Sequence, residues 1–440
     1  MDNEHAMSKI EVKNITKIFG PRDKEVLPKV EAGMSKEELL AETGHTLGLN
    51  NVSLTIGEGE IFVIMGLSGS GKSTMIRHFN RLIEPTAGQI IVDGVDVMSL
   101  NRKELEDFRR HKMSMVFQRF GLLPHRTVVQ NVAYGLEVQG VKKQGREDKA
   151  REWIEAVGLG GFENQFPSQL SGGMQQRVGL ARALATDADV LLMDEAFSAL
   201  DPLIRSQMQD QLVELQEKLH KTIVFITHDL DEALRIGDKI AILKDGELSQ
   251  VGTPPEILLQ PADDYVRAFV RDVNRARVLT VDTVMQPPEW RITHDNMERA
   301  LAEMRRKGEE YGYVVENKEF RGVVTQEALE EEINKPGKNP SLYEFADDSS
   351  KVDLESTIEA ALPATLESDY PVAVVDEEGH FKGVLNTDEV GSILTPPDEG
   401  EEAEGDKTPD AAASDDGAIK DQDPAEDAQK SDKTSVKHAS

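Results

Sequence analysis

Short apolar runs alternate with longer segments of helical periodicity between about residue 50 and residue 252. The apolar runs are 61–65, 190–193, 223–226 and 240–243. Runs of this length between helical patterns are typical of strands buried in a sheet. Residues 8–20 alternate apolar and polar positions in strand fashion and end on a Gly-Pro pair. This order of elements predicts a mixed α/β domain with a largely parallel sheet.

A polar stretch interrupts the pattern near its start, and a charged segment follows its end. Residues 21–48 separate the first strand from the elements that follow it. Within them, Ser35 and Glu38 form a capping-box pattern that predicts a short helix through Leu39 and Leu40. Further along, residues 255–278 carry four arginines and are predicted to form a charged helical connector.

An internal repeat follows the connector. Residues 311–325 (YGYVVENKEFRGVVT) align with residues 370–386 (YPVAVVDEEGHFKGVLN), and both copies are predicted to form strand, turn, strand and the start of a helix. An amphipathic helix is predicted before each copy, over 297–306 and 358–366. A repeat of about 60 residues implies two similar α+β units that pack together.

The composition narrows the possible functions. The chain has 440 residues, with 50 lysines and arginines against 81 acidic residues, a formal net charge of −31 and no cysteine. The lack of cysteine excludes disulfides, thiolate metal sites and cysteine nucleophiles. The negative charge argues against a nucleic-acid partner and against a polybasic membrane-surface protein. The longest apolar run, 61–65, is too short to span a bilayer, and residues 1–5 lack a secretion signal, so we expect a soluble, intracellular protein.

The last segment of the chain differs from the rest. Residues 396–440 hold 14 acidic residues and 5 lysines and show no apolar periodicity. Such a segment buries too little apolar surface to offset the entropy lost on ordering. We therefore expect a disordered acidic tail there, after an N-terminal domain over 8–277 and a repeat module over 278–395.

The clearest chemical motif directly follows the predicted strand 61–65 and precedes a helical pattern. It has the form GxxxxGK[ST], and its residues are Gly66, Leu67, Ser68, Gly69, Ser70, Gly71, Lys72, Ser73 and Thr74. Small residues let successive backbone N–H groups curl around a phosphate at a helix N-terminus. We expect Lys72 to reach the β- and γ-phosphates of a nucleotide and the Ser73 hydroxyl to ligate Mg²⁺. The alternative, a Gly/Ser loop with a chance lysine, is disfavoured by the strand-to-helix context.

Two acidic residues end the apolar run at 190–193. Asp194 falls where the metal of a phosphate loop needs a carboxylate, and Glu195 is placed to polarise an attacking water molecule. Two acids that merely cap a strand are the alternative reading of the pair. A phosphate loop upstream in the same chain favours the catalytic one.

A second motif for binding anions lies 23 residues before Asp194. It comprises Ser171, Gly172, Gly173 and Gln175, ahead of a helical pattern. By itself such a Ser-Gly-Gly sequence is more often a turn than a site. One ATP could contact both motifs only if they met across a dimer. A predicted strand ends near His228, which suggests a side chain aimed at the γ-phosphate, although a lone histidine is usually a surface or core residue.

Together these motifs resemble the nucleotide-binding subunit of an ABC transporter over residues 8–253. In that resemblance, 66–74 is the Walker A loop, Gln118 the Q-loop glutamine, 170–176 the signature, 190–194 the Walker B strand, Glu195 the catalytic glutamate, 198–201 the D-loop ending at Asp201, and His228 the switch histidine. The family implies Mg²⁺ ligation by Ser73, Gln118 and Asp194, and an aromatic residue at Phe19 that stacks on adenine. It also implies catalytic roles for Glu195, His228 and Lys72.

The resemblance further implies a homodimer with two ATP molecules at its interface, on the cytoplasmic face of the inner membrane. The dimer would drive an integral-membrane permease and, indirectly, an extracytoplasmic substrate-binding protein. The 21–48 insertion and the C-terminal repeat are similar to the ProV-type branch, which imports glycine betaine, proline betaine and related quaternary amines. In that branch the repeat corresponds to tandem CBS domains.

Some alternatives stay open at this point. Another cargo, such as choline, carnitine or an amino acid, would leave this subunit's sequence motifs unchanged. A soluble ABC ATPase that acts on ribosomes or DNA would instead predict two tandem ATPase cores or basic surfaces. CBS units that bind adenosine nucleotides usually carry Ser or Thr and, three residues later, Asp. The pairs here are Thr325 with Ala328 and Asn386 with Glu389, so we do not expect that type of nucleotide site.

Overall fold

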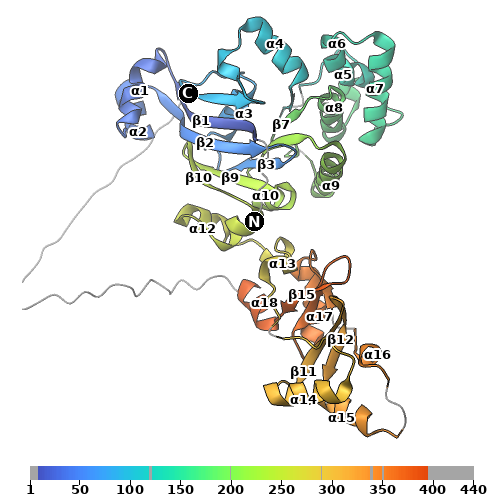
Figure 1. Ribbon diagram of the computed structural model, residues 1–440. Coiled ribbons are helices and arrows are strands. Elements are labelled where there is room, and N and C mark those ends of the chain that lie inside the picture. The colour runs from blue at the N-terminus through green and yellow to red at the C-terminus, as the bar shows by residue number, and fades with distance from the viewer. Residues whose placement is uncertain are drawn as a thin grey trace, which may run out of the picture. The chain divides into compact units, whose positions relative to one another are not determined.

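The computed structural model describes residues 8–117, 121–198, 200–288, 290–336, 340–348 and 351–394. Gln118 and the predicted acidic tail therefore lie outside the described residues. Residues 8–252 contain two sheets (Figure 1). Their strands are β1 (Ser8–Phe19), β2 (Thr46–Gly57), β3 (Ile61–Met65), β4 (Ala87–Val92), β5 (Val95–Asp96), β6 (Met113–Val116), β7 (Val190–Asp194), β8 (Thr222–Ile226), β9 (Lys239–Lys244) and β10 (Glu247–Gly252).

The larger sheet is largely parallel, as the alternating pattern predicts. Its order is β10-β9-β3-β8-β7-β6, and only the edge strand β10 is antiparallel to its neighbour. All five residues of β3 are buried. Ile61, Val63 and Met65 belong to one hydrophobic core, whereas Phe62 and Ile64 belong to another on the opposite face. Two covered faces explain why this strand is apolar throughout instead of alternating.

The smaller sheet is antiparallel, in the order β2-β1-β4-β5. Its inner face packs against the larger sheet, with α3 (Lys72–Phe79) in the same core. The other helices of this region are α4 (Arg102–His111), α5 (Val128–Val132), α6 (Tyr134–Val138), α7 (Lys143–Ala156), α8 (Gly172–Ala185), α9 (Pro202–Leu219) and α10 (Leu230–Ile236), with 3-10 turns η1 (Val97–Ser99) and η2 (Pro167–Gln169). Helices α5 to α8 enclose a separate small core.

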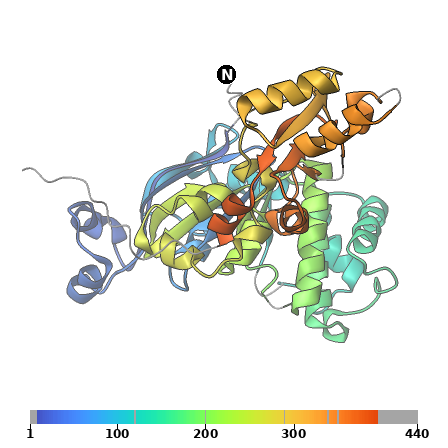
Figure 2. The same cartoon turned by 90° about the horizontal axis from the view of Figure 1, so that it is seen from below.

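The insertion differs from the prediction in two ways. It forms two helices, α1 (Asp23–Glu31) and α2 (Lys36–Thr43), where the sequence predicts only one. Pro28 lies inside α1 and hides its helical pattern, because proline in a helix interior usually ends the helix. The last residues of the predicted insertion, 46–48, belong to β2. The capping box of Ser35 and Glu38 at the start of α2 is confirmed, and Figure 2 shows the two helices projecting beyond the sheets.

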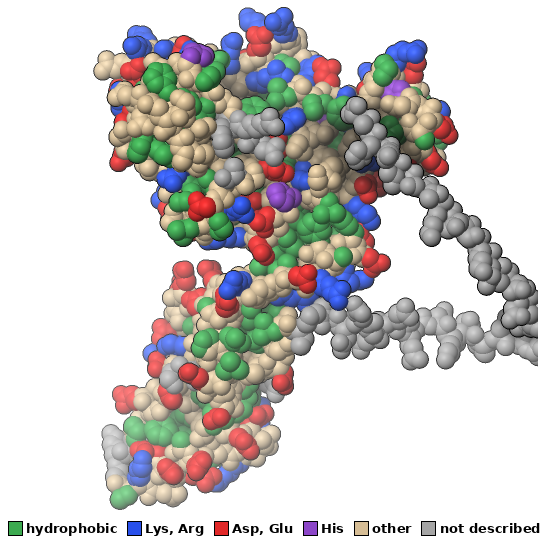
Figure 3. Space-filling view, turned by 180° about the vertical axis from the view of Figure 1, so that it is seen from behind, with side chains coloured by type: hydrophobic (Ala, Val, Ile, Leu, Met, Phe, Trp, Pro, Cys, Tyr) green, Lys and Arg blue, Asp and Glu red, His purple; other side chains and the backbone are tan. Residues whose placement is uncertain are grey.

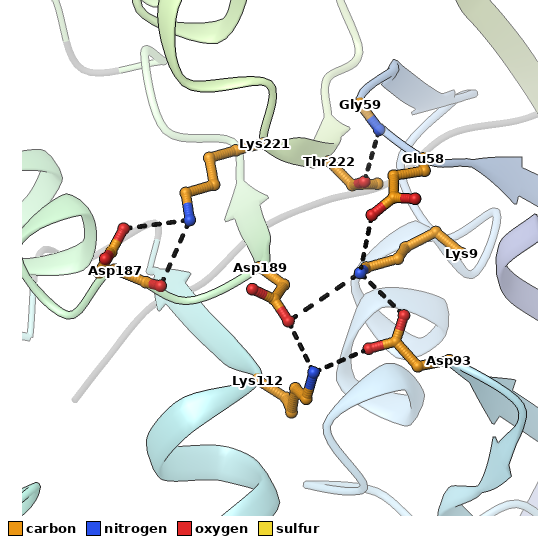
Figure 4. Close-up of polar contacts among 9 residues, drawn as sticks. All are labelled: Lys9, Glu58, Gly59, Asp93, Lys112, Asp187, Asp189, Lys221 and Thr222. Atoms are coloured by element: carbon orange, nitrogen blue, oxygen red, sulfur yellow. Dashed lines mark hydrogen bonds and ion pairs between the residues drawn. The ribbon is translucent and has the colours of Figure 1, made fainter. Parts of the chain in front are cut away.

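A network of charged residues joins the starts of several strands (Figure 4). Lys9 of β1 has a side chain only 8% exposed, and its Nζ lies 2.8 Å from Asp93, 3.4 Å from Glu58 and 3.9 Å from Asp189. Lys112 pairs with the same two aspartates, at 3.1 Å and 2.8 Å. Burial opposes the charge of Lys9, but the pairs with Asp93 and Asp189 outweigh it, so the pKa of Lys9 is raised. The network thus connects both sheets at the end opposite the loop that follows β3.

Replacing Lys9 with Met is expected to lower the free energy of unfolding by about 2 kcal/mol. A buried charge that loses its only partner typically costs about 3–5 kcal/mol, but Lys112 remains beside both aspartates. Urea unfolding is followed by Trp153 fluorescence in a Trp290→Phe background, so that the signal comes from α7 of the N-terminal region and not from the C-terminal units. Lys13→Met, on the exposed side of β1, is the matched control, with an expected change of about 0.5 kcal/mol or less. Equal effects of the two variants would show that the network adds nothing to stability.

The predicted repeat is present. Its first unit contains α14 (Met297–Lys307), β11 (Tyr311–Glu316), β12 (Glu319–Thr325), α15 (Gln326–Asn334) and α16 (Leu342–Phe345). The second contains β13 (Lys351–Asp353), α17 (Ile358–Glu367), β14 (Val372–Val375), β15 (Phe381–Leu385) and α18 (Thr387–Leu394). In one unit Ile292 pairs in parallel with Val314, and in the other Val352 pairs in parallel with Val374. The two partners are separated by the same number of residues in both pairs, and the second pair lies 60 residues after the first. The duplication therefore extends beyond the aligned hairpins.

The connector is broken rather than continuous. It consists of α11 (Pro254–Leu259), α12 (Asp264–Val270), the 3-10 turn η3 (Arg275–Arg277) and α13 (Val281–Val284). The Asp263 side chain caps the start of α12 by accepting a hydrogen bond from the backbone N–H of Val266. Helix α12 is therefore a separate helix and does not continue α11. Residues after η3 then pair with the second unit, not the first: Thr280 bridges Thr357, and Gln286 bridges Val384.

The surface is consistent with the acidic composition. On the face drawn in Figure 3, Asp and Glu side chains are spread among basic and apolar ones and do not form one patch. None of the described helices is long and apolar enough to cross a membrane.

Candidate nucleotide-binding site

The loop between β3 and α3 contains two positions at which only glycine can be accommodated. Gly66 has φ 144°, and a Cβ there would collide with the carbonyl oxygen of Leu243. Gly71 has φ 103°, and a Cβ there would lie 2.7 Å from the carbonyl oxygen of Gly48. Helix α3 begins immediately afterwards at Lys72, so the loop places the unpaired N–H groups of a helix start beside the cavity.

Two polar side chains of this loop are buried. Ser70 is 4% exposed, and its hydroxyl has no hydrogen-bond partner among the described residues. Lys72 is also buried, and its Nζ donates to the carbonyl oxygens of Gly66 at 2.7 Å and Leu67 at 2.9 Å. Burial lowers the pKa of Lys72, while the charges of Glu195 and Asp194 oppose that shift. A buried ammonium group held by two carbonyls suits the recognition of phosphate oxygens.

A pair of oxygen ligands lies next to the loop. The Ser73 hydroxyl donates to Asp194 Oδ1 at 2.9 Å, and Asp194 is 1% exposed at the end of β7. Arg77 pairs with the other carboxylate oxygen of Asp194 at 3.1 Å. A hydroxyl and a carboxylate are the hard oxygen donors that Mg²⁺ prefers. These two residues therefore fit the metal that the motif predicts.

Glu195 follows Asp194 in a backbone conformation that is unusual for its residue type. Its φ is 47°, in the left-handed region, and its N–H donates to the carbonyl oxygen of Ile226 at 3.1 Å. Residues in such strained conformations cluster at functional sites. His228, after the neighbouring strand β8, has its Nδ1 3.5 Å from Glu195 Oε1. Side chains from two adjacent strand ends thus converge beside the loop.

Several of these residues line one cavity of about 670 Å³. The residues predicted from the sequence that line it are Phe19, Leu67, Ser68, Gly69, Gly71, Lys72, Ser73, Thr74, Glu195 and His228. Phe19 lies on its wall, with the Nζ of Lys17 5.3 Å from the ring centroid. A volume of this size is typical of sites for nucleotides and other small molecules.

The sequence reasoning missed Lys36, which also lines the cavity. Lys36 is the first residue of α2, and its Nζ lies 4.0 Å from Asp245. Its position directly after the capping serine was visible in the sequence, but only the fold brings the insertion beside Phe19 and the loop. The insertion is thus part of the cavity wall.

Comparison with known proteins identifies the family. A sequence model described as "ABC transporter" matches residues 49–198. The chain is 51% identical over 392 residues to the glycine betaine/carnitine transport ATP-binding protein GbuA of Listeria monocytogenes, which covers 88% of this chain and 97% of that protein. The chain belongs to the ABC transporter ATP-binding proteins.

Two further relatives agree with this assignment. The glycine betaine/proline betaine transport system ATP-binding protein ProV of Salmonella typhimurium is 49% identical over 384 residues, or 86% of this chain and 95% of that protein. The glycine betaine transport ATP-binding protein OpuAA of Bacillus subtilis is 48% identical over 383 residues, or 86% and 90%. The predicted ABC ATPase and its α/β fold are confirmed. As an ABC ATPase, the chain binds and hydrolyses ATP.

Some predicted residues of the ABC ATPase lie away from the cavity. Ser171 caps α8 by accepting from the N–H of Met174 at 3.3 Å, and Asp201 caps α9 by accepting from the N–H of Ile204 at 3.1 Å. Residues Ser171, Gly172, Gly173, Gln175 and Asp201 do not line the cavity around the phosphate loop. Gly66 and Ser70 of that loop and Asp194 next to it do not line the cavity either. Their contact with nucleotide stays a prediction, as does that of Gln118, which lies outside the described residues.

Proposed function

We propose that this ABC ATPase powers the import of glycine betaine, proline betaine or a related quaternary amine through an integral-membrane permease. The observation that carries the proposal is identity of about half over 86–88% of the chain to three proteins whose names include glycine betaine transport. Carnitine, which the name of GbuA includes, is the second candidate cargo.

The residues of the cavity have distinct roles in this proposal. Lys72 and the backbone N–H groups of the loop bind the β- and γ-phosphates, and Phe19 stacks on adenine. Ser73, Asp194 and Gln118 hold Mg²⁺, which neutralises charge on the phosphate oxygens when bound. Glu195 polarises the attacking water molecule, and His228 contacts the γ-phosphate from the neighbouring strand end.

A second subunit completes the site. The serine-glycine start of α8, with Gln175 and Asp201, lies outside the cavity of its own chain but presents a helix N-terminus. In a head-to-tail homodimer, the partner subunit's Ser171, Gly172 and Gly173 face the γ-phosphate bound by the first subunit. Each dimer then binds two ATP molecules between the two chains.

One groove of the ATPase region is suited to docking of the permease. A groove of about 560 Å³ is lined by the exposed apolar side chains Leu82, Phe117, Tyr134 and Val138 together with several arginines. Exposed apolar patches rimmed by polar residues mark sites of protein interaction. We assign this groove to a permease loop at the cytoplasmic membrane face, with the substrate-binding protein on the other side of the membrane.

The C-terminal units form a regulatory module in this proposal. The duplicated pairing of Ile292 with Val314 and Val352 with Val374 supports tandem CBS domains over 278–395. Thr325 Oγ1 accepts the N–H of Ala328 at 3.1 Å, so the hydroxyl of the first copy caps its own helix. This contact supports the prediction that the module lacks the usual adenosine site.

Uptake of labelled glycine betaine after a salt upshift tests the proposed function. The test uses a host strain that lacks its other systems for betaine uptake and carries Glu195→Gln on the chromosome. We expect uptake to be lost in this strain, because transport requires ATP hydrolysis. Val138→Glu in the groove is expected to abolish uptake while ATP binding persists. Glu217→Gln, on the exposed face of α9, is the control and should transport normally. Normal betaine uptake with Glu195→Gln would overturn the cargo assignment, and labelled carnitine would be tested next.

A further inference from the structure

A cavity of about 470 Å³ lies in the C-terminal module, remote in sequence from the ATP site. Its wall includes three aromatic side chains, Trp290, Tyr311 and Tyr313, and two carboxylates, Glu309 and Glu389. Among the residues that the structure describes, no lysine, arginine or histidine lines it. A cavity with this lining suits a positively charged ligand.

The aromatic walls are held in place by the fold. Tyr311 and Tyr313 are alternate residues of β11, so their side chains lie on the same face of the strand. Their ring centroids are 5.7 Å apart and their planes meet at 81°, which makes a corner with two aromatic walls. The Tyr313 hydroxyl donates to the carbonyl oxygen of Pro371 at 2.7 Å, and Tyr370 packs against Tyr311 at 4.8 Å. Each tyrosine of the corner is therefore held by a contact with residues 370–371.

Trp290 lines the cavity and also packs against Gly312, which has no side chain. A Cβ at Gly312 would lie 3.0 Å from the Trp290 ring, closer than ordinary contact. The Nζ of Lys307 lies 5.4 Å from the centroid of the same ring, so Trp290 already attracts one cation. Aromatic faces attract cations through the quadrupole of the ring.

The two carboxylates have no cationic partner in the described part of the chain. No ion pair involves Glu309, and the contact of Glu389 is a hydrogen bond from the N–H of Asn386 at 3.3 Å. Their negative charge repels a phosphate group and attracts a cation. A ligand that fits must present diffuse positive charge to both rings and carboxylates.

We propose that this cavity binds a quaternary ammonium cation. Such a group has no N–H to donate, so it gains from aromatic faces and nearby negative charge instead of directional hydrogen bonds. Small metal cations are strongly hydrated and would lose water on entering an aromatic corner. That this cation is the transported solute itself rests on the proposed function. In that case, binding of the solute from inside the cell to the module would regulate the ATPase according to the internal solute concentration.

Tryptophan fluorescence tests binding directly, because the chain has only two tryptophans. In the full chain with Trp153→Phe, Trp290 is the sole reporter, and tetramethylammonium chloride is titrated at constant ionic strength. We expect a saturable change that sodium, potassium and adenosine monophosphate do not produce. Glu309→Gln should weaken binding about 5-fold. Glu310→Gln, at the adjacent exposed position, is the matched control and should change it by about 2-fold or less.

Several outcomes would overturn the inference. These are no saturable change with tetramethylammonium, an equal response to potassium, displacement by adenosine monophosphate, or equal weakening by Glu310→Gln. Glu389→Gln provides a second variant at the other carboxylate of the cavity, and its binding should fall as well. Failure of binding leaves the uptake result untouched, whereas normal uptake with Glu195→Gln would remove the cargo assignment and leave the measured binding intact.

Discussion

Glu195→Gln is expected to reduce ATP hydrolysis by about 10²- to 10⁴-fold, because the amide cannot take a proton from the attacking water molecule. The amide has nearly the same shape, so the left-handed backbone at this position and the cavity wall should be preserved. ATP binding is therefore expected to persist, and the variant should accumulate as a closed dimer with bound nucleotide. Phosphate release measures hydrolysis, and size-exclusion chromatography with ATP measures dimerisation.

The control for this prediction is Glu217→Gln, which changes an exposed glutamate of α9 in the same way. Its hydrolysis rate should equal that of the unmodified protein. If Glu195→Gln turns over ATP at the unmodified rate, then Glu195 is not the general base. The 3.5 Å contact with His228 would then have to be explained as structural.

Lys72→Ala is expected to weaken ATP binding by about 10- to 100-fold, the range for losing hydrogen bonds from a charged group. The ammonium of Lys72 is buried, and its removal leaves the phosphates without their nearest cation in the loop. Equilibrium binding of a fluorescent ATP analogue measures the loss. Protection against heating supplies a second readout, since a ligand that binds the folded state raises the melting temperature.

An exposed lysine provides the comparison for Lys72. Lys24 lies on the outer side of α1, and Lys24→Ala should bind ATP normally. The melting temperature of each variant is measured without nucleotide first, because Lys72 is buried and also interacts with the charges of Glu195 and Asp194, so that the nucleotide-dependent rise is compared and not the absolute value. Normal affinity in Lys72→Ala would show that the loop does not bind nucleotide through this side chain.

Local patterns predicted the elements and motifs well, because both are written in short stretches of sequence. The strands β3, β7, β8 and β9 coincide with the apolar runs, and the Ser35 capping box starts α2 as predicted. What failed depended on contacts between distant residues. Nothing near Lys36 indicates that it reaches the ATP cavity, and nothing near Pro28 indicates that a helix continues past it.

The residues of the ATP site also divide into those that local sequence patterns predict and those that only the fold brings together. The loop, Asp194 and Glu195 were found by spacing, but the Arg77 pair with Asp194 was not, because it joins α3 to β7 across the sheet. The aromatic cavity of the C-terminal module was also invisible. Trp290, Tyr311 and Glu389 are separated by up to about 100 residues, and only the packing of the two units brings them together.

The pairing of the connector with the second C-terminal unit has a consequence for the order of folding during synthesis. The six-stranded sheet is complete once β10 ends at Gly252, so the ATPase region can fold while the rest of the chain is still being made. Thr280 and Gln286 can form their β-bridges only after Thr357 and Val384 have emerged from the ribosome. The contacts between the connector and the second unit therefore form late, and a ribosome-arrested chain ending near residue 345 should contain a folded ATPase region and a connector without its partners in the second unit.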